Sequence, residues 1–243
     1  MLIALVSAKG SPGVTTAALA LAAAWPRQAC VLDADPCGGD VRVGIGGGAW
    51  PAGRGLTELV VQSRAGLTEE LLADHLHRPA DHSPPVMAGL GCIGQASGVP
   101  WDRIGPFLAR LQGGDVVADC GRYLFADGVV PLLAAADLVV LVAGSSLRSA
   151  RAASRTAPLL RGGAGADPVV VVSRPGAPYS AREISDSCEL TLAGVLGDDP
   201  RSAAVWSDGV PPARGFSRAA LQRDARRVAE ALATTAASVR GAA

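Results

Sequence analysis

The chain has 243 residues, of which 49% are apolar and 18% charged, and its formal net charge is zero with a pI near 6.8. This length and composition fit one globular domain with a sizeable core and exclude a disordered chain. The balanced charge gives no overall field that would attract nucleic acid or an acidic membrane, so any such contact would need a local patch.

Apolar runs alternate with helical patterns along the whole chain. The predicted strands cover 2–7, 29–33, 116–119, 138–143, 169–173 and 192–196. The predicted helices cover 15–25, 56–64, 68–77, 101–111, 147–160, 181–188 and about 216–239. Continuous Val and Leu runs separated by helices are typical of a parallel sheet covered on both faces. The sequence therefore predicts an α/β fold with a doubly wound, mostly parallel sheet, in a single domain over 1–243.

The turn between the first predicted strand and the first predicted helix contains Lys9, the only lysine of the chain. Strand, glycine-containing turn and helix are the usual parts of a phosphate-binding loop, in which backbone N–H groups and the positive helix end face an anion. Against the pattern G-x-x-x-x-G-K-[ST], Gly13 and Thr15 match, whereas Ala8 and Val14 replace the first glycine and the lysine. We therefore expect phosphate binding mainly through backbone N–H groups and Lys9.

Acidic and polar residues stand at the ends of later predicted strands. Asp33 and Asp35 leave the second strand in the sequence Asp-Ala-Asp-Pro, which is also an ordinary turn. Asp119 ends the strand 116–119, and Ser173 ends a run of four valines. Because ligands bind at the carboxyl ends of parallel strands, we expect these side chains and Lys9 to converge on one site.

Two glycine- and proline-rich segments, about 36–55 and 79–100, interrupt the pattern and are predicted to be flexible. Loops of this length are either functional or disordered. Switch or partner-binding segments and structureless surface insertions are equally supported alternatives for them.

With these motifs in place, the chain resembles the ParA/MinD family of P-loop ATPases, whose deviant Walker A loop reads roughly K-G-G-x-G-K-T-T. Five positions match that loop: Lys9, Gly10, Gly13, Thr15 and Thr16. Two differ: Ser11 replaces a glycine, and Val14 replaces the second lysine. Pro12, at the variable position, lacks an N–H donor. Later strands and a Gly-Val-Pro sequence are also similar, so the resemblance covers nearly the whole chain.

The resemblance implies a site for ATP and Mg²⁺. It assigns nucleotide contacts to nine positions: Lys9, Gly10, Ser11, Gly13, Val14, Thr15, Thr16, Asp119 and Ser173. It makes Thr15 the direct metal ligand and lets Asp119 hold the water shell of the metal. It gives catalytic roles to Lys9, which would reach the phosphates of a dimer partner, and to Asp35, which would position the attacking water.

The family also implies a function. It suggests a nucleotide-dependent dimerising switch for intracellular positioning, in chromosome or plasmid partitioning, division-site placement, or localisation of a pilus or secretion machine, with a protein partner of that system. Because Val14 removes a cation from the developing charge, at about 3–4 kcal/mol, hydrolysis is expected to be impaired or absent while binding survives better. A pseudo-ATPase adaptor without turnover is the alternative, and a small-molecule ligase is a much weaker one.

The cysteines and the termini bear on location and partners. Five cysteines lie far apart without a Cys-x-x-Cys pair, and no signal peptide or membrane span is recognisable, so a cytoplasmic protein with reduced thiols is expected. A peripheral location at membrane or nucleoid is a weaker alternative. The last predicted helix carries arginines opposite an apolar stripe that lacks Trp or Phe anchors, which favours a packed helix over a DNA- or membrane-binding one. His75 and His77 do not share a helix face, so a metal role is not expected.

Overall fold

The computed structural model describes residues 1–9, 12–123, 128–163, 167–176 and 178–242. A seven-stranded sheet in the order β3-β2-β4-β1-β5-β6-β7 forms its centre, and all neighbouring strands run parallel. The strands are β1 Leu2–Ser7, β2 Ala29–Asp33, β3 Val86–Met87, β4 Asp115–Arg122, β5 Leu138–Gly144, β6 Val169–Ser173 and β7 Thr191–Leu196. The chain winds outward from β1 in both directions, so the predicted doubly wound α/β fold is confirmed.

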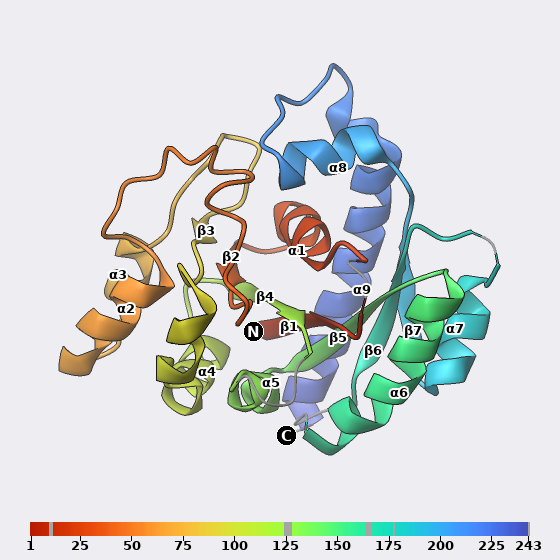
Figure 1. Ribbon diagram of the computed structural model, residues 1–243, viewed down its shortest axis with the longest axis horizontal. Helices are drawn as coiled ribbons and strands as arrows, with labels where there is room; N and C mark the ends of the chain where they lie inside the picture. Colours follow the sequence, from red (N-terminus) through yellow and green to blue (C-terminus); the bar gives the residue numbers. More distant parts are fainter. Residues whose placement is uncertain (10–11, 124–127, 164–166, 177, 243) are drawn as a thin grey trace.

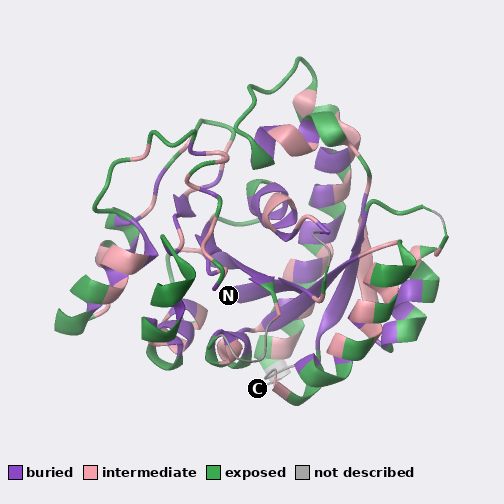
Figure 2. Ribbon diagram, in the orientation of Figure 1, coloured by how far each residue is buried: buried purple, intermediate pink, exposed green. Residues whose placement is uncertain are grey.

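Helices cover both faces of the sheet (Figure 1). One face carries α1 Val14–Ala23, α8 Pro200–Ser207 and α9 Ala220–Ala242. The other carries α4 Trp101–Ala109, α5 Val130–Ala135, α6 Leu147–Gly163 and α7 Ala181–Cys188, with α2 Leu56–Gln62 and α3 Glu69–Asp74 beside β3. The central strands are buried along their length (Figure 2), because each face packs against its own apolar helix layer.

Most predicted elements occur, and the differences have physical causes. The segment 79–100, expected to be a loop, contains β3 and a 3-10 stretch, Ile93–Gly98; a two-residue strand is too short to show as a pattern. Two short helices, α5 and α8, were not predicted; α8 begins with Asp199 capping the Ser202 N–H and Pro200 in its first turn. The last helix is divided, since a separate 3-10 turn, Phe216–Arg218, precedes α9.

The segment 36–55 packs against the chain that follows α3. The Trp50 and His77 rings stack with centroids 4.4 Å apart, and the Gly55 N–H donates to His75 Nδ1 at 3.2 Å. His77 also forms an antiparallel bridge with Val86, which covers the outer edge of β3. Burial lowers the pKa of both histidines, so they act here as neutral packing groups.

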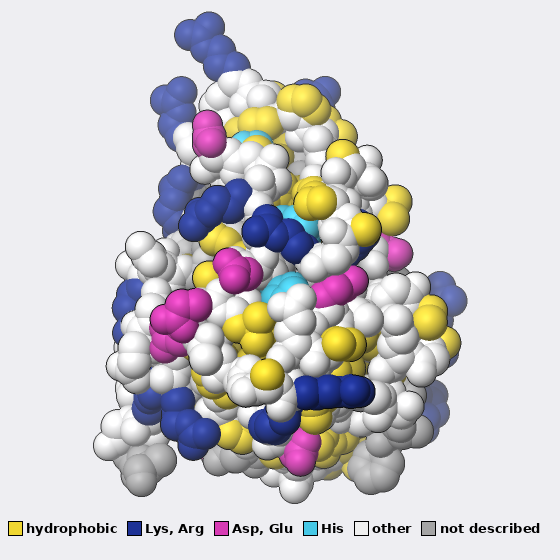
Figure 3. Space-filling view, turned by 90° about the vertical axis from the view of Figure 1, so that its left-hand side faces the viewer, with side chains coloured by type: hydrophobic (Ala, Val, Ile, Leu, Met, Phe, Trp, Pro, Cys, Tyr) yellow, Lys and Arg dark blue, Asp and Glu magenta, His cyan; other side chains and the backbone are white. Residues whose placement is uncertain are grey.

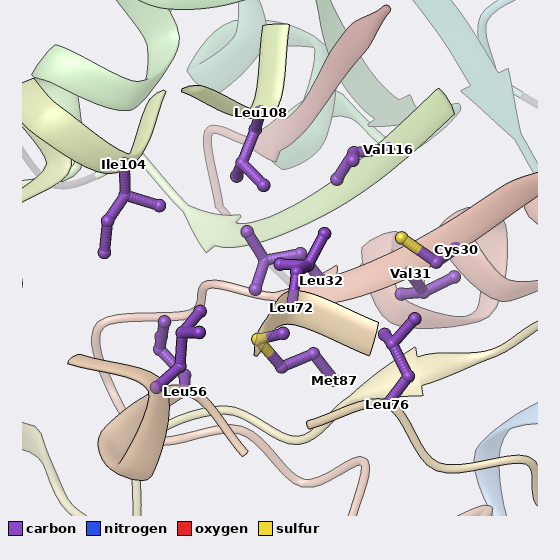
Figure 4. Close-up of a pocket in the computed structure, with 11 residues that line it drawn as sticks. Cys30, Val31, Leu32, Leu56, Leu72, Leu76, Met87, Ile104, Leu108 and Val116 are labelled. Carbon is purple, nitrogen blue, oxygen red and sulfur yellow. The ribbon is translucent and has the colours of Figure 1, made fainter. Parts of the chain in front are cut away.

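The interior beside β2 is closed. Figure 4 shows Leu32, Leu72, Met87 and Leu108 meeting there from β2, α3, β3 and α4. The remaining gap has a volume of only about 10 Å³ and an apolar lining, which is no more than the space of one water molecule. This cavity therefore belongs to the core and is not a ligand site. Figure 3 shows the outer side of this region, where acidic and basic side chains are intermingled.

Candidate functional site

The carboxyl ends of the central strands bring the predicted acidic residues together. Asp33 of β2 and Asp119 of β4 are register partners, and the Ala34 N–H donates to the Asp119 carbonyl oxygen at 2.8 Å. Asp35 lies close enough to both to influence their ionisation. The structure thus gathers three carboxyl groups from two strands at one edge of the sheet.

The N-terminus of α1 lies at the same edge. Gly13 adopts φ +87°, a left-handed conformation that glycine allows, and α1 begins at Val14. Among the described residues, no side chain caps this end of α1, and its first turn contains no acidic residue. Since the first amides of a helix lack carbonyl partners within it, this end fits an anion. Gly10 and Ser11, which were predicted to touch the nucleotide, lie outside the described residues.

Val14 and Lys9 differ sharply in exposure. Val14 is 6% exposed and belongs to the apolar cluster on the α1 face of the sheet. Lys9 is exposed, and Thr15 and Thr16 are half-buried. Position 14 therefore contributes packing, and the lysine of this loop is the exposed one.

Thr15 and Asp119 are in direct contact. The Thr15 hydroxyl donates to the Asp119 carboxylate, and the Gly121 N–H donates to the same group at 3.0 Å. Burial raises the pKa of Asp119 to about 6 despite these two hydrogen bonds, and the charge of Asp35 contributes in the same direction. A hydroxyl and a carboxylate at the end of a helix are the hard oxygen donors that Mg²⁺ prefers.

Asp33 is buried between two glycines. A Cβ atom on Gly39 would lie 1.6 Å from Asp33 Oδ2, and one on Gly89 would lie 2.7 Å from its Cγ, so both positions exclude side chains. Asp33 Oδ2 has no hydrogen-bond partner among the described residues. Burial and the nearby Asp119 charge raise the pKa of Asp33 well above its ordinary value. An orphaned buried carboxyl oxygen fits a site that receives a cation and its water shell.

Asp35 is half-buried and faces Gly121 near the C-terminal end of β4. It accepts a hydrogen bond from the Cys37 N–H at 2.8 Å, and a Cβ on Gly121 would lie 2.1 Å from its Oδ2. Gly121 has φ +58°, so the backbone approaches the carboxylate where no side chain could. Burial raises the pKa of Asp35, and the nearby Arg122 opposes that rise. Gly39, Gly89 and Gly121 were not predicted from sequence, because only the folded chain shows what each glycine faces.

Ser173 lies at the end of β6 but makes a contact that was not predicted. It is 6% exposed, and its hydroxyl donates to the carbonyl oxygen of Pro12 at 2.5 Å. This hydrogen bond therefore connects the turn before α1 to β6. Its predicted contact with a nucleotide base would compete with this bond.

The described residues include no group of three His, Cys, Asp or Glu side chains arranged to hold a metal ion. A magnesium ion here would therefore depend on Thr15, Asp119, water and phosphate oxygens together, as is common for this ion. Among the described helices, none combines the length and the apolar character needed to cross a membrane.

Comparison with known proteins supports the fold. No protein-family model and no curated protein matches the sequence. A ParA family ATPase from Chlorobium tepidum TLS matches with a TM-score of 0.74 and 16% identity, over 94% of this chain and 98% of that one. The septum site-determining protein MinD of Pyrococcus horikoshii OT3, complexed with Mg-ADP, matches with a TM-score of 0.74 and 16% identity, over 98% of both chains. An ATP complex of a McdA variant from Cyanothece matches with a TM-score of 0.66 and 17% identity, over 96% of both chains. The chain thus has the fold of the ParA and MinD ATPases.

Proposed function

We propose that this protein is a ParA/MinD-like, nucleotide-dependent dimerising switch in intracellular positioning, with impaired or absent ATP hydrolysis. The observation that carries the proposal is the meeting of the α1 N-terminus, which no described side chain caps, with the Thr15–Asp119 pair and with Asp33 Oδ2, which has no hydrogen-bond partner among the described residues. The structures with the same fold include a putative plasmid partition protein and a septum site-determining protein, and some of the structures have Mg-ADP or ATP bound.

Different residues of the site would contact different parts of the ligand. The first amides of α1 and Lys9 would hold phosphate oxygens, and Thr15 and Asp119 would hold Mg²⁺ and its water shell. Bound Mg²⁺ neutralises phosphate charge. Asp35, whose carboxylate lies near those of Asp33 and Asp119, would hold a water molecule by accepting a hydrogen bond from it. In the same scheme, Gly10, Ser11, Thr16 and Ser173 complete the nucleotide contacts.

Weak turnover follows from Val14. A buried valine supplies no charge to the transferring phosphoryl group, and loss of one preorganised electrostatic contact costs about 3–4 kcal/mol in the transition state. Binding is less affected, since backbone amides, Lys9 and Mg²⁺ remain. Dimerisation, with Lys9 of each protomer reaching the phosphates bound by its partner, is then the useful output.

A pseudo-ATPase adaptor of the same fold is the second candidate. Two contacts favour it: Val14 packs into the core, and the Ser173 hydroxyl donates to the Pro12 carbonyl oxygen. Both contacts are made within the chain itself. In this case the protein would bind its partner through a surface that does not change with nucleotide.

Both candidates imply a protein partner from a division, partitioning, pilus or secretion system. One structure with the same fold is a MinC:MinD cell division protein complex from Aquifex aeolicus. Contact with DNA or membrane through the C-terminal helix is less favoured. The apolar residues of α9, including Leu221, Val228 and Leu232, are buried against the sheet and α1 rather than exposed.

Calorimetric titration of the wild-type protein with ATP and with ADP, each with Mg²⁺, tests the proposal. The switch predicts measurable binding at up to millimolar nucleotide, and light scattering with a non-hydrolysable ATP analogue then detects a dimer. Lys9→Ala is expected to remove the dimer while leaving the fold intact, because an exposed lysine contributes little to stability. Asp35→Ala is expected to prolong the dimer if any hydrolysis occurs.

The two candidates give opposite results in this experiment. Absence of heat for both nucleotides, with a monomer under all conditions, would rule out the switch and favour the adaptor. A Lys9→Ala protein that dimerises like the wild type would remove the proposed role of Lys9.

A further inference from the structure

Two exposed cysteines lie on neighbouring loops at the edge of the site. Cys37 follows the Asp35-Pro36 turn, and Cys92 precedes the 3-10 stretch Ile93–Gly98. A Cβ on Gly38, the residue after Cys37, would lie 3.7 Å from Cys92 Cα and 3.9 Å from its backbone nitrogen. The Cβ–Cα bond of Gly38 adds about 1.5 Å to this distance, and the step from the Gly38 Cα to the Cys37 Cα adds about 3.8 Å. The Cα atoms of Cys37 and Cys92 are therefore at most about 9 Å apart.

At that upper limit, a disulfide requires the two loops to approach each other by roughly 2–5 Å. Bridged cysteines have Cα atoms about 4.4–6.8 Å apart. Glycines flank both thiols: Gly38, which has φ +96°, and Gly39 follow Cys37, while Gly91 precedes Cys92. Glycine tolerates backbone conformations that other residues do not, which favours the backbone adjustment that a bridge requires.

Cys37 is chemically linked to the carboxylate cluster. Its thiol and its backbone N–H both donate hydrogen bonds to Asp35. Any reaction at the sulfur therefore removes one donor from Asp35, a residue at the centre of the site. The reaction would also fix the Asp35 loop to the segment that contains Cys92.

The other three thiols are poorer candidates. Burial raises the pKa of Cys30 to about 12 and raises the pKa of Cys120 and Cys188 as well. Since the thiolate is the reacting form, these residues react slowly. Exposure and proximity together single out Cys37 and Cys92.

We propose that Cys37 and Cys92 are a redox modification site, which forms a reversible intramolecular disulfide in exchange with a small-molecule disulfide such as oxidised glutathione. The Cys92 thiolate attacks one glutathione sulfur, the glutathione S–S bond breaks, and the departing thiolate takes up a proton. Cys37, which has lost its proton to solvent, then attacks the mixed disulfide at the Cys92 sulfur and releases the second glutathione. Two protein thiols are oxidised, and one glutathione disulfide is reduced to two thiols.

Peptide mapping of the full-length protein after equilibration with oxidised glutathione tests the site. Trypsin leaves Cys37 in the fragment 28–42 and Cys92 in the fragment 65–103, because the Arg78–Pro79 bond resists cleavage. The expected result is a cross-linked pair of these fragments, about 2 Da lighter than their sum, which disappears after reduction. The intact protein should remain in the mobility range of a single chain.

Three variants distinguish a Cys37–Cys92 disulfide from other disulfides. Cys37→Ser and Cys92→Ser should each abolish the cross-link, whereas Cys30→Ala, which changes the other thiol of the fragment 28–42, should retain it. A cross-link that survives in Cys37→Ser would assign the bond to Cys30 and overturn the proposal. Only mixed disulfides with glutathione, only links between two chains, or no modification at all would overturn it equally. None of these outcomes depends on nucleotide binding, so the test is independent of the proposed switch.

Discussion

Asp33 and Asp119 are register partners on β2 and β4, and each is only 1% exposed. Two carboxyl groups so placed cannot both ionise at ordinary cost in a buried environment, and their pKa values are raised accordingly. In the protein without a cation, ionisation of both carboxyl groups is therefore unfavourable. A bound cation would relieve this repulsion, so the pKa values of Asp33 and Asp119 should report whether the site is filled.

The raised pKa of Asp119 predicts a specific dependence of stability on pH. Because its pKa is about 6 in the folded protein and 3.8 in the reference state, the folded chain holds its proton more strongly, and the contribution of Asp119 to stability is lost as pH rises from about 4 to 6. The loss is on the order of 2–3 kcal/mol at 1.36 kcal/mol per pKa unit. Asp119→Asn should remove this part of the dependence, as measured by urea unfolding at several pH values.

The informative quantity is the difference between wild type and Asp119→Asn in how the free energy of unfolding depends on pH. The lowered pKa values of His75 and His77 act in the opposite direction, because protonation below their ordinary pKa destabilises the folded state, and both proteins share that effect. Parallel pH curves for wild type and Asp119→Asn would show that Asp119 ionises normally.

Restoring a lysine at position 14 should strengthen nucleotide binding. Val14→Lys places an ammonium group beside the phosphate region, and a tenfold gain in ATP affinity corresponds to about 1.4 kcal/mol. The ligand-free variant should lose about 1–3 kcal/mol of stability, because Val14 is buried and a polar group replaces it. Val14→Met is the matched control, a long side chain without charge. Equal ATP affinities of the two variants in calorimetry would contradict a role for charge at this position.

Loss of the Ser173 hydroxyl should loosen the phosphate loop. Ser173→Ala removes the hydrogen bond to the Pro12 carbonyl and leaves that buried acceptor without its partner, at a cost of about 1 kcal/mol. Hydrogen exchange should become faster at the amides of residues 13–16 and stay unchanged in β7, and unfolding experiments should show the loss of stability. Ser149→Ala, which removes a comparable side-chain bond to the Gly144 N–H, serves as the control. Unchanged exchange at residues 13–16 would show that this turn is held by other contacts.

A cluster around Asp115, at the start of β4, should support the fold without affecting the site. Asp115 is buried and accepts hydrogen bonds from the Met1 ammonium group at 2.6 Å, from Trp25 Nε1 at 2.8 Å and from Arg27 Nε at 2.9 Å. Burial opposes its ionisation, but these bonds outweigh burial and lower its pKa. Asp115→Asn leaves buried positive charge unpaired and should cost about 3 kcal/mol in urea unfolding.

The cluster around Asp115 also has a characteristic pH effect. A carboxyl with a lowered pKa in the folded state stabilises the protein above its ordinary pKa, and that contribution disappears as pH falls below about 4. Asp115→Asn should therefore show a flatter loss of stability in acid than the wild type, with unaltered nucleotide affinity. Weaker nucleotide binding in this variant would indicate that β4 transmits the change to Asp119.

The alternation of valine-rich runs with helical patterns was enough to predict the fold class. Burial on both faces of a parallel sheet demands such runs, and the helices between them repeat every 3.6 residues, so both signals are local in sequence. Short elements escaped prediction for the same reason. β3 has two residues, α5 has six, and their positions depend on neighbours such as the His77–Val86 bridge rather than on periodicity.

The sequence by itself determined which residues could form the site: a lone lysine, glycine and threonine before a helix, and aspartates at strand ends. Only the tertiary structure decided how they are used. It places Asp33 against Gly39 and Gly89, and it turns Ser173 toward Pro12 across 161 residues of sequence separation. Sequence patterns report local periodicity and motif spacing, whereas burial, loss of solvation and shared hydrogen bonds arise only when distant segments pack together.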